Sequence, residues 1–278
     1  MAVSRTNEWF AVVILGTATR RPSRPNRMKK FELLSFATAD ELARAAASAW
    51  LGEVESANRA GKVQCIALSG GRIAQTFFAS VVEQARARKI GDGGTTFLPD
   101  NVHFFWADER CVPPGDPESN FKLANELLFA PLGIPENQIH RLRGEEAPAV
   151  AVREAEAELR RLAPANPAGQ PVLDLVLLGM GEDGHVASLF PGAPAGIVQN
   201  TAPFLMVENS PKPPPRRLSL SYVAIAAAKQ VWVLISGAGK EKALRESLDF
   251  PGKTPLGRVI QLRQNTRIYS EIRLNRAG

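Results

Sequence analysis

The sequence predicts an α/β fold: a doubly wound, mostly parallel, Rossmann-like sheet with helices on both faces. Three observations lead to this prediction. Short runs of Val, Leu, Ile and Phe recur along the 278 residues, and such runs are typical of strands that are buried on both faces. Stretches with apolar residues at helical spacing separate these runs. Glycine-rich or charged turns follow four of the runs, at the strand ends where open α/β sheets bind ligands.

Composition and charge narrow the class of protein. The chain is 45% hydrophobic, which is enough for one large domain or two small ones, and no apolar run is long enough to span a bilayer. The net charge is +6, but residues 1–30 hold seven basic residues and one acidic residue, which leaves 27 of each kind elsewhere. The body of the chain therefore has no overall field that would hold a nucleic acid. Neither Cys65 nor Cys111 lies in a metal-ligand or disulfide pattern, so we expect a cytoplasmic enzyme without a metal.

Residues 1–30 look like an addition to this domain. An apolar stretch at 9–15 precedes an Arg- and Pro-rich segment, which is the reverse of the order in a secretory signal. We expect a basic arm that is poorly ordered or not native, with Met28 as the true start. A transit peptide is the alternative, since acidic residues are scarce in this stretch. A single catalytic domain would then span residues 31–278.

The domain begins with two strand–helix units. An apolar run predicts a strand at 31–36, and the capping box Thr38-Ala-Asp-Glu41 starts a helix that continues to about residue 59. The next buried strand, 63–68, is followed by a helix over 73–89.

The turn between that second strand and its helix reads Ser69-Gly70-Gly71-Arg72. A strand, a glycine turn and a helix form a phosphate-binding layout, because backbone N–H groups and the positive end of the helix dipole face the anion. The turn lacks the spacing of a Walker loop or a GxGxxG loop, which disfavours ATP and NAD.

A loop at 91–100 leads to the third buried strand, 102–106, in which His103 is expected to be a core or edge residue. Asp108, Glu109 and Arg110 follow at the strand end, in position for a ligand; the alternative is a solvated turn with an Asp–Arg pair. Beyond them we expect a helix at 119–129, a short strand at 139–142 with His140 near the surface, and a helix at 147–162.

The central strand is predicted at 173–178, and three glycines with Glu182, Asp183 and His185 follow it directly. Glycine permits a sharp turn and the close approach of a ligand. His185 is therefore the candidate catalytic base, since imidazole titrates near neutral pH; a structural turn histidine is the alternative. Ser188 is not expected to be a nucleophile, because no G-x-S-x-G motif surrounds it.

The last third of the chain repeats the alternation. We expect strands at 204–208, 218–220, 231–236 and 266–270, helices at 222–228 and from about 240 to 248, and a stiff basic proline loop at 212–217. Lys240 lies where a helix begins, a position at which the helix dipole favours anions over cations. Such a position suits a lysine that meets a phosphate.

The turns after the four buried strands should meet, because the carboxyl ends of parallel strands lie at the same edge of a sheet. They would contribute backbone N–H groups, two acids, one histidine and the cations Arg72, Arg110 and Lys240. This combination predicts a site for a small anion with acid–base chemistry beside it.

Six segments also carry a resemblance: LSGG at 68–71, WADERCVP at 106–113, SNF at 119–121, GMGEDGHVASLFPG at 179–192, PPPRRLSLS at 213–221 and SGAGK at 236–240. Together they resemble the 6-phosphogluconolactonase family, which belongs to a sugar-phosphate superfamily with glucosamine-6-phosphate deaminase. The resemblance runs from about residue 31 to the C-terminus. The chain departs from it at Arg72-Ile73-Ala74, where Ser-Thr-Pro often follows the glycines; an added arginine would favour an anion.

The resemblance implies hydrolysis of 6-phospho-D-glucono-1,5-lactone to 6-phospho-D-gluconate, the second step of the oxidative pentose phosphate pathway, with no cofactor. It implies His185 as general base, Asp183 as its support and Arg110 as the group that binds or polarises the substrate. The residues expected to hold the substrate and its phosphate are Ser69, Gly70, Gly71, Arg72, Asp108, Arg217 and Lys240. We expect a monomer or small homo-oligomer that binds a sugar phosphate and neither nucleic acid nor membrane.

Three other functions stay open. A deaminase or isomerase of the same superfamily would show a DEY-type turn and an asparagine after the GH pair, where this chain has DER and Val-Ala-Ser. A non-catalytic sugar-phosphate sensor would keep the phosphate turns and could lose His185. A nucleic-acid binder that uses the basic arm would lose salt-sensitive binding on removal of residues 1–27.

Overall fold

The computed structural model describes residues 30–90, 95–96, 101–249 and 252–274. The expected arm at 1–30 therefore lies, apart from Lys30, outside the described residues. At the centre is a six-stranded sheet in which every neighbouring pair of strands is parallel. In spatial order its strands are β1 (Glu32–Ser35), β11 (Arg267–Ser270), β10 (Gln230–Ile235), β7 (Leu175–Gly179), β2 (Gln64–Leu68) and β5 (Val102–Trp106). The predicted α/β class is confirmed, and each of these six strands overlaps a strand that the sequence predicts.

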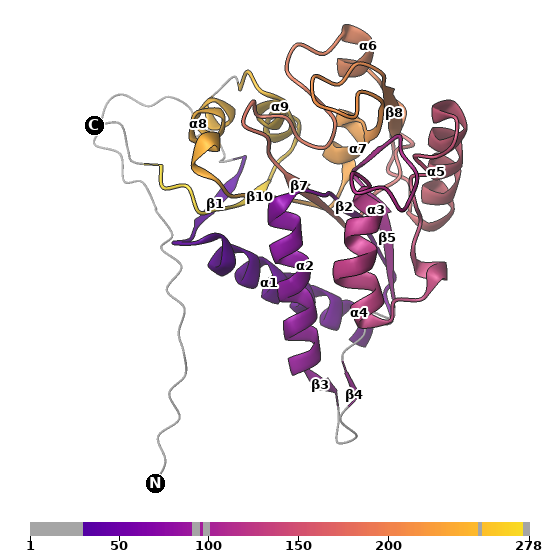
Figure 1. Ribbon diagram of the computed structural model, residues 1–278, viewed down its shortest axis with the longest axis vertical. Helices are drawn as coiled ribbons and strands as arrows, with labels where there is room; N and C mark the ends of the chain where they lie inside the picture. Colours follow the sequence, from indigo (N-terminus) through magenta and orange to yellow (C-terminus); the bar gives the residue numbers. More distant parts are fainter. Residues whose placement is uncertain (1–29, 91–94, 97–100, 250–251, 275–278) are drawn as a thin grey trace.

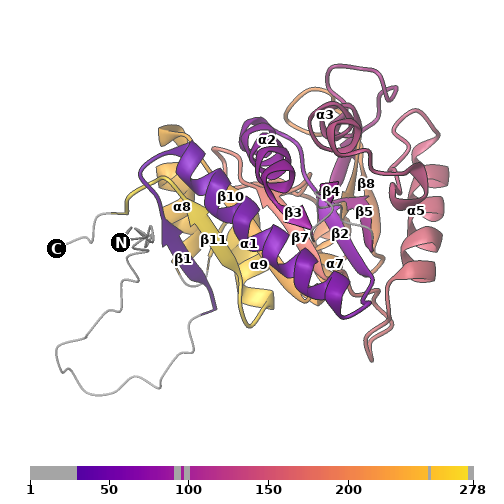
Figure 2. The ribbon, with the colours of Figure 1, turned by 90° about the horizontal axis from the view of Figure 1, so that it is seen from below.

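Helices cover both faces of the sheet (Figures 1 and 2). On one face lie α1 (Ala39–Arg59) and α2 (Arg72–Ala87), and on the other lie α7 (Tyr222–Ala227), α8 (Glu241–Leu248) and α9 (Pro255–Leu262). The cap forms as expected on one side, since Oγ1 of Thr38 accepts from the N–H of Glu41. On the other side the Glu41 carboxylate reaches back to the N–H of Ala37, one residue before the N-cap, instead of to Thr38. In the described part of the chain, no helix is both long and apolar enough to cross a membrane.

Buried aromatic side chains join α1 and α2 to the sheet. The Trp50 ring of α1 lies 6.2 Å from the Phe77 ring of α2 and 6.2 Å from the Phe104 ring of β5. All three side chains are almost fully excluded from solvent. This packing holds the start of α2, and with it the turn after β2, in a fixed place beneath the site.

A second sheet of three antiparallel strands lies beside the first: β6 (Asp108–Arg110), β9 (Arg217–Leu220) and β8 (Phe204–Val207). The predicted turn at residues 108–110 is wrong, because these residues form strand β6. The chain leaves the parallel sheet at Ala107 and pairs with β9, so that Arg110 lies opposite Arg217. The helix α5 (Pro148–Leu162) packs against β8 and β9.

Other differences from the predicted elements are local. Instead of a strand at 139–142, only Ile139 bridges to Phe104. The expected helix at 119–129 is divided into α3 (Asn120–Ala124), a π-helical turn (Asn125–Phe129) and α4 (Ala130–Leu132). Two-residue strands pair here: β3 (Lys89–Ile90) begins at the last residue of the expected helix, and β4 (Thr95–Thr96) lies within the expected loop. The rest of 91–100 lies outside the described residues. Three further short helical segments are α6 (Ala195–Val198), one at Glu136–Gln138 and one at Ala238–Lys240.

The order of the strands places a cleft between β2 and β7. These two strands are neighbours in the sheet, but the chain continues from β2 to the edge strand β5 and from β7 towards β10 and β11 on the other side. The connections after β2 and β7 therefore diverge. Such a switch point is where open α/β sheets bind their ligands.

Candidate active site

A cleft that is open to solvent lies at the carboxyl ends of the parallel strands. It is lined by residues from all four segments that the sequence analysis expected to converge: the turn after β2, strand β6, the turn after β7 and the turn after β10. The lining includes all the predicted site residues but one, namely Ser69, Gly70, Gly71, Arg72, Asp108, Arg110, His185, Arg217 and Lys240. The exception, Asp183, reaches the cleft through its contact with His185.

His185 is held on its turn by backbone and side-chain contacts. The N–H of Gly181 donates to the carbonyl oxygen of His185 at 2.9 Å, and a side chain at position 181 would overlap the imidazole. Gly184 has a φ of 80°, which favours glycine at this point of the turn. The Phe190 ring lies 4.7 Å from the imidazole. These contacts restrict the orientation of the imidazole ring.

Asp183 fixes the tautomer of this histidine. Oδ1 of Asp183 lies 2.5 Å from Nδ1 of His185, so the proton on Nδ1 is donated to the carboxylate and Nε2 is the nitrogen left for a ligand. Burial lowers the pKa of His185, the contact with Asp183 opposes this, and the Lys212 ammonium adds to the lowering. Burial would raise the pKa of Asp183, but the hydrogen bond and charge of His185 bring it below its ordinary value. At neutral pH the pair is a neutral imidazole beside a carboxylate, which is the form of a general base.

The part of the cleft lining formed by the start of α2 is suited to an anion. Helix α2 begins after Gly71, which has a φ of 97°, with no side-chain cap and no acidic residue in its first turn. By contrast, α1 is capped by Thr38 and has two acidic residues in its first turn. The hydroxyl of Ser69 is buried and has no hydrogen-bond partner within the described residues. An uncapped helix start beside an unpartnered hydroxyl is an arrangement that binds phosphate.

Two cations stand beside this helix start. Arg72 and Lys240 both line the cleft. Burial lowers the pKa of Lys240, and the nearby Arg72 lowers it further, while Glu182 opposes the shift. An anion that binds between two partly buried cations reduces the electrostatic repulsion between them.

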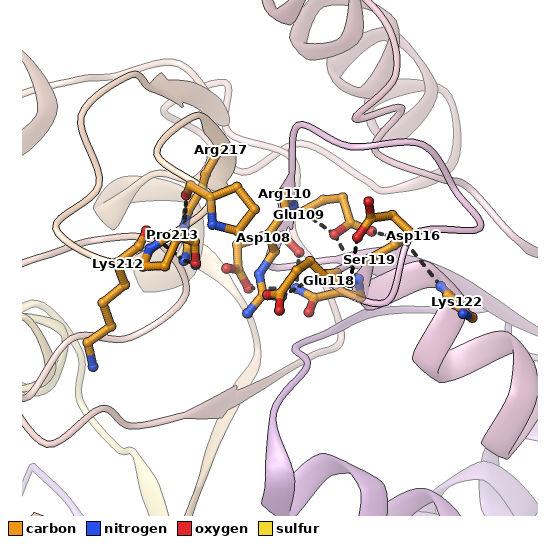
Figure 3. A network of polar contacts seen from close by, with 12 residues as sticks. Asp108, Glu109, Arg110, Asp116, Glu118, Ser119, Lys122, Lys212, Pro213 and Arg217 are labelled. Carbon is orange, nitrogen blue, oxygen red and sulfur yellow. Dashed lines mark hydrogen bonds and ion pairs between the residues drawn. The ribbon is translucent and has the colours of Figure 1, made fainter.

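Arg217 is occupied mainly by its own loop (Figure 3). Its Nε donates to the carbonyl of Pro214 at 3.0 Å, and its Nη2 donates to the carbonyls of Lys212 and Pro213 at 3.1 and 2.9 Å. Burial lowers the pKa of Arg217, and the charge of Arg110 adds to this. The predicted phosphate ligand therefore also holds the basic proline loop at the rim of the cleft.

One nitrogen of the Arg110 guanidinium has a hydrogen-bond partner in the protein, and another nitrogen has none among the described residues. Nη1 donates to the main-chain carbonyl of Glu118 at 2.5 Å and lies 3.4 Å from its carboxylate. Nε is buried, and no described residue accepts a hydrogen bond from it. A buried donor without a partner at the wall of a cleft is suited to an oxygen atom of a ligand.

Three polar residues that were not among the predicted site residues also belong to this region. Asn120 lines the cleft, and its Nδ2 donates to the carbonyl of Asp108 at 2.9 Å. The buried hydroxyl of Ser188 donates to Oδ2 of Asp108 at 2.8 Å. Glu109 is buried behind the wall and accepts hydrogen bonds from the start of α3. Each of the three lies in a segment that carries the family resemblance (106–113, 119–121 and 179–192), but its role depends on packing partners that are distant in the sequence.

A second cavity shares no lining residue with the first, and His140 is the histidine in its lining. His140 was expected near the surface, and this was wrong, because its side chain is only 7% exposed. Helix α5 covers it, and Oε1 of Glu158 lies 2.9 Å from its Nδ1. His103, expected in the core or at an edge, lies on edge strand β5 beside it. Within the described residues, no group of three or more His, Cys, Asp or Glu side chains is placed to hold a metal ion.

Comparison with known proteins places this chain in a family. The family described as glucosamine-6-phosphate isomerases/6-phosphogluconolactonase matches residues 37–269. The 6-phosphogluconolactonase of Mycobacterium tuberculosis is 35% identical over 203 residues, which are 66% of this chain and 81% of the relative. That of Haemophilus influenzae is 35% identical over 188 residues, which are 68% of this chain and 75% of the relative.

Solved structures agree with this assignment. The 6-phosphogluconolactonase of Trypanosoma brucei is 27% identical and superimposes with a TM-score of 0.71 over 85% of this chain and 94% of the other. A monomeric glucosamine-6-phosphate deaminase, only 18% identical, shares the fold with a TM-score of 0.67 over 85% of this chain and 95% of the other. The match across most of the domain, together with the relatives at 35% identity, shows that the chain belongs to the glucosamine-6-phosphate isomerase/6-phosphogluconolactonase family.

Proposed function

We propose that this protein hydrolyses 6-phospho-D-glucono-1,5-lactone to 6-phospho-D-gluconate, the second step of the oxidative pentose phosphate pathway. One observation carries the proposal: a neutral histidine paired with Asp183 lines the same cleft as the uncapped start of α2 and two cations. The cleft thus offers both a base and a phosphate site. The curated relatives at 35% identity, named 6-phosphogluconolactonase, support the same reaction.

The hydrolysis follows from the placement of these groups. Nε2 of His185 takes a proton from water as the water oxygen attacks the lactone carbonyl carbon, and the carbonyl oxygen gains negative charge. The unpartnered Nε–H of Arg110 donates to this oxygen. When the tetrahedral intermediate collapses, the bond from the carbonyl carbon to the ring oxygen breaks, and the imidazolium returns its proton to that oxygen. Asp183 stabilises the imidazolium between these two steps.

The remaining cleft residues bind and orient the substrate. The backbone N–H groups at Gly71 and Arg72, the Ser69 hydroxyl and the Lys240 ammonium hold the phosphate. Asp108 and Asn120 face the sugar hydroxyls from the β6 side. Hydrolysis of an ester changes no oxidation state, so the reaction needs no redox cofactor.

The decisive experiment measures hydrolysis of freshly generated lactone by the wild type and by His185→Ala, with the spontaneous rate subtracted. General-base catalysis contributes about 10²- to 10⁴-fold, so the variant should lose that much of kcat. His103→Gln, a change at a histidine outside the cleft, is the matched control and should keep the wild-type rate at pH 8.

Each other outcome has a definite meaning. Turnover that survives in His185→Ala would keep the lactonase and remove His185 from its role. A folded wild type that does not hydrolyse the lactone would reject the proposal. Glucosamine-6-phosphate would then be tested as a substrate, and its binding without turnover would favour a sensor.

A cytoplasmic location and a monomer or small homo-oligomer stay predictions from the sequence. Location varies among the relatives, since a protein from Oryza sativa that is 38% identical over 151 residues is described as chloroplastic. Fractionation of the producing cell and light scattering of the purified protein would test these two predictions.

A further inference from the structure

Glu109 is a buried carboxylate for which the proposed mechanism has no use. It is 2% exposed and does not line the cleft. Its two oxygens accept hydrogen bonds from the N–H of Arg110 at 2.7 Å, the hydroxyl of Ser119 at 3.1 Å, and the N–H groups of Asn120 and Phe121, each at 2.8 Å. The last two are the first N–H groups of α3, which otherwise lack partners inside their helix. Glu109 therefore joins strand β6 to the start of α3 (Figure 3).

Arg110, the residue after Glu109, contacts the same segment just before the start of α3. Nη1 of Arg110 donates to the main-chain carbonyl of Glu118, and the next residue, Ser119, donates to Glu109. The guanidinium is thus placed by a carbonyl group, and the segment that carries this carbonyl is placed by Glu109. The geometry of Arg110 depends on Glu109 through this short path.

The start of α3 also sets the distance to the phosphate site of the cleft. Asn120 is the first residue of α3, and its side chain donates to the carbonyl of Asp108. Its carboxamide lies against Gly70 so closely that a side chain at Gly70 would overlap it. One carboxylate therefore fixes Arg110 on one side and the contact with the glycine turn on the other.

We propose that Glu109 is a positioning residue for the hydrolysis. It fixes the distance between Arg110 and the glycine turn. At that distance the phosphate can bind at the start of α2 while Nε of Arg110 donates to the lactone carbonyl oxygen. Glu109 does not touch the substrate, and its effect is exerted through Arg110. This inference rests on the proposed lactonase activity.

The test is a double-mutant cycle between Glu109→Gln and Arg110→Met, with kcat and KM measured for the lactone. The amide of Gln has nearly the shape of the carboxylate, but its NH₂ group faces N–H and O–H donors of residues 119–121 and cannot accept from them. The segment at the start of α3 therefore shifts. A misplacement of about 1 Å can cost roughly 100-fold in rate, so we expect kcat to fall about 10- to 100-fold in Glu109→Gln, with KM changing much less. In the Arg110→Met background the same change should lower kcat less than about 3-fold, because two groups that act as a unit are not additive.

Two controls separate positioning from a general loss of structure. Glu126→Gln makes the same chemical change at an exposed position in the segment that follows α3 and should leave kcat unchanged. Circular dichroism melting identifies the folded fraction to which kcat is normalised. If Glu109→Gln does not fold, Glu109→Asp keeps the charge, shortens the reach, and replaces it in the cycle.

The outcomes are distinct. Equal losses of kcat in the wild-type and Arg110→Met backgrounds would show a role independent of Arg110 and overturn the inference. Wild-type kcat in folded Glu109→Gln would overturn it too. A wild type without lactone hydrolysis would instead overturn the proposed function.

Discussion

Nδ1 of His103 lies 2.8 Å from Nε2 of His140, so these two imidazoles share one proton across the contact between β5 and the segment that follows the helical turn Glu136–Gln138. The other nitrogen of His140 lies 2.9 Å from a carboxylate oxygen of Glu158. Burial lowers the pKa of both histidines, with Arg161 adding to this for His103. A second proton would place two N–H groups against each other.

This pair should make the protein sensitive to acid. The folded pKa values are below the unfolded value of about 6.5, so the unfolded chain binds more protons in acid. The contribution of the two histidines to the free energy of unfolding is complete above about pH 6.5 and is lost as the pH falls towards the lowered folded pKa values. The loss is about 1.4 kcal/mol for each tenfold difference in proton affinity between the folded and unfolded states. Urea unfolding between pH 8 and pH 5 measures this loss. His140→Phe should show a shallower pH dependence; an identical slope would contradict the prediction.

Replacement of Asp183 should affect the rate more than the affinity for substrate. Asp183→Asn no longer holds the Nδ1 tautomer of His185, and kcat should fall roughly 10²- to 10⁴-fold with little change in KM. Because the carboxylate opposes the lowering of the His185 pKa, the acidic limb of the pH–rate profile should move to lower pH in the variant. Asp249→Asn, at an exposed position, is the control. An unchanged kcat would remove Asp183 from the mechanism.

Loss of the Lys240 ammonium should weaken phosphate binding. A charge-assisted hydrogen bond is worth about 1.5–3 kcal/mol, so Lys240→Met should raise KM roughly 10- to 100-fold and weaken inhibition by inorganic phosphate similarly. Lys242→Met offers a matched control, because the Lys242 side chain is 89% exposed on the helix that follows. Equal effects of the two changes would mean a general loss of positive charge rather than a phosphate contact.

Arg263 should matter for stability alone. Its buried guanidinium donates to the carbonyls of Ile225, Ala226 and Ala228 at the end of α7, and burial lowers its pKa to about 10. Arg263→Lys cannot reach all these carbonyls, and leaving them without partners should cost about 2–3 kcal/mol in the free energy of urea unfolding. Arg153→Lys, at an exposed position, should cost less than about 0.5 kcal/mol. A reduced kcat in folded Arg263→Lys would show that the effect is not on stability alone.

The parallel sheet was predictable because strands buried on both faces are continuous apolar runs, and β2, β5, β7 and β10 all show this pattern. Strand β6 has the opposite character. Its charged residues Asp108 and Glu109 are buried only because Ser188, Asn120 and other distant groups donate to them. No local pattern predicts that. Helix α9 had a usable signal that was overlooked: Thr254 caps it and Pro255 occupies its first turn.

The candidate site was predictable to the extent that it consists of turns at strand ends. Glycines and charged residues directly after an apolar run identify those turns, and the parallel sheet brings them together. The position of Arg110 opposite Arg217 depends on the pairing of β6 with β9, which joins segments about a hundred residues apart in the sequence. The chemical roles of these residues stay predictions until the variants are measured.

The pairing of β1 with β11 has a consequence for the order in which the protein can be assembled on the ribosome. Glu32 pairs with Arg267, 235 residues later, and β11 separates β1 from β10 in the six-stranded sheet. While the chain is being synthesised, the other strands can associate, but β1 has no place in the sheet until β11 has left the ribosome. A chain that stopped before β11 would therefore lose two strands from the sheet rather than one, and would leave the edge of β10 open to association with other chains.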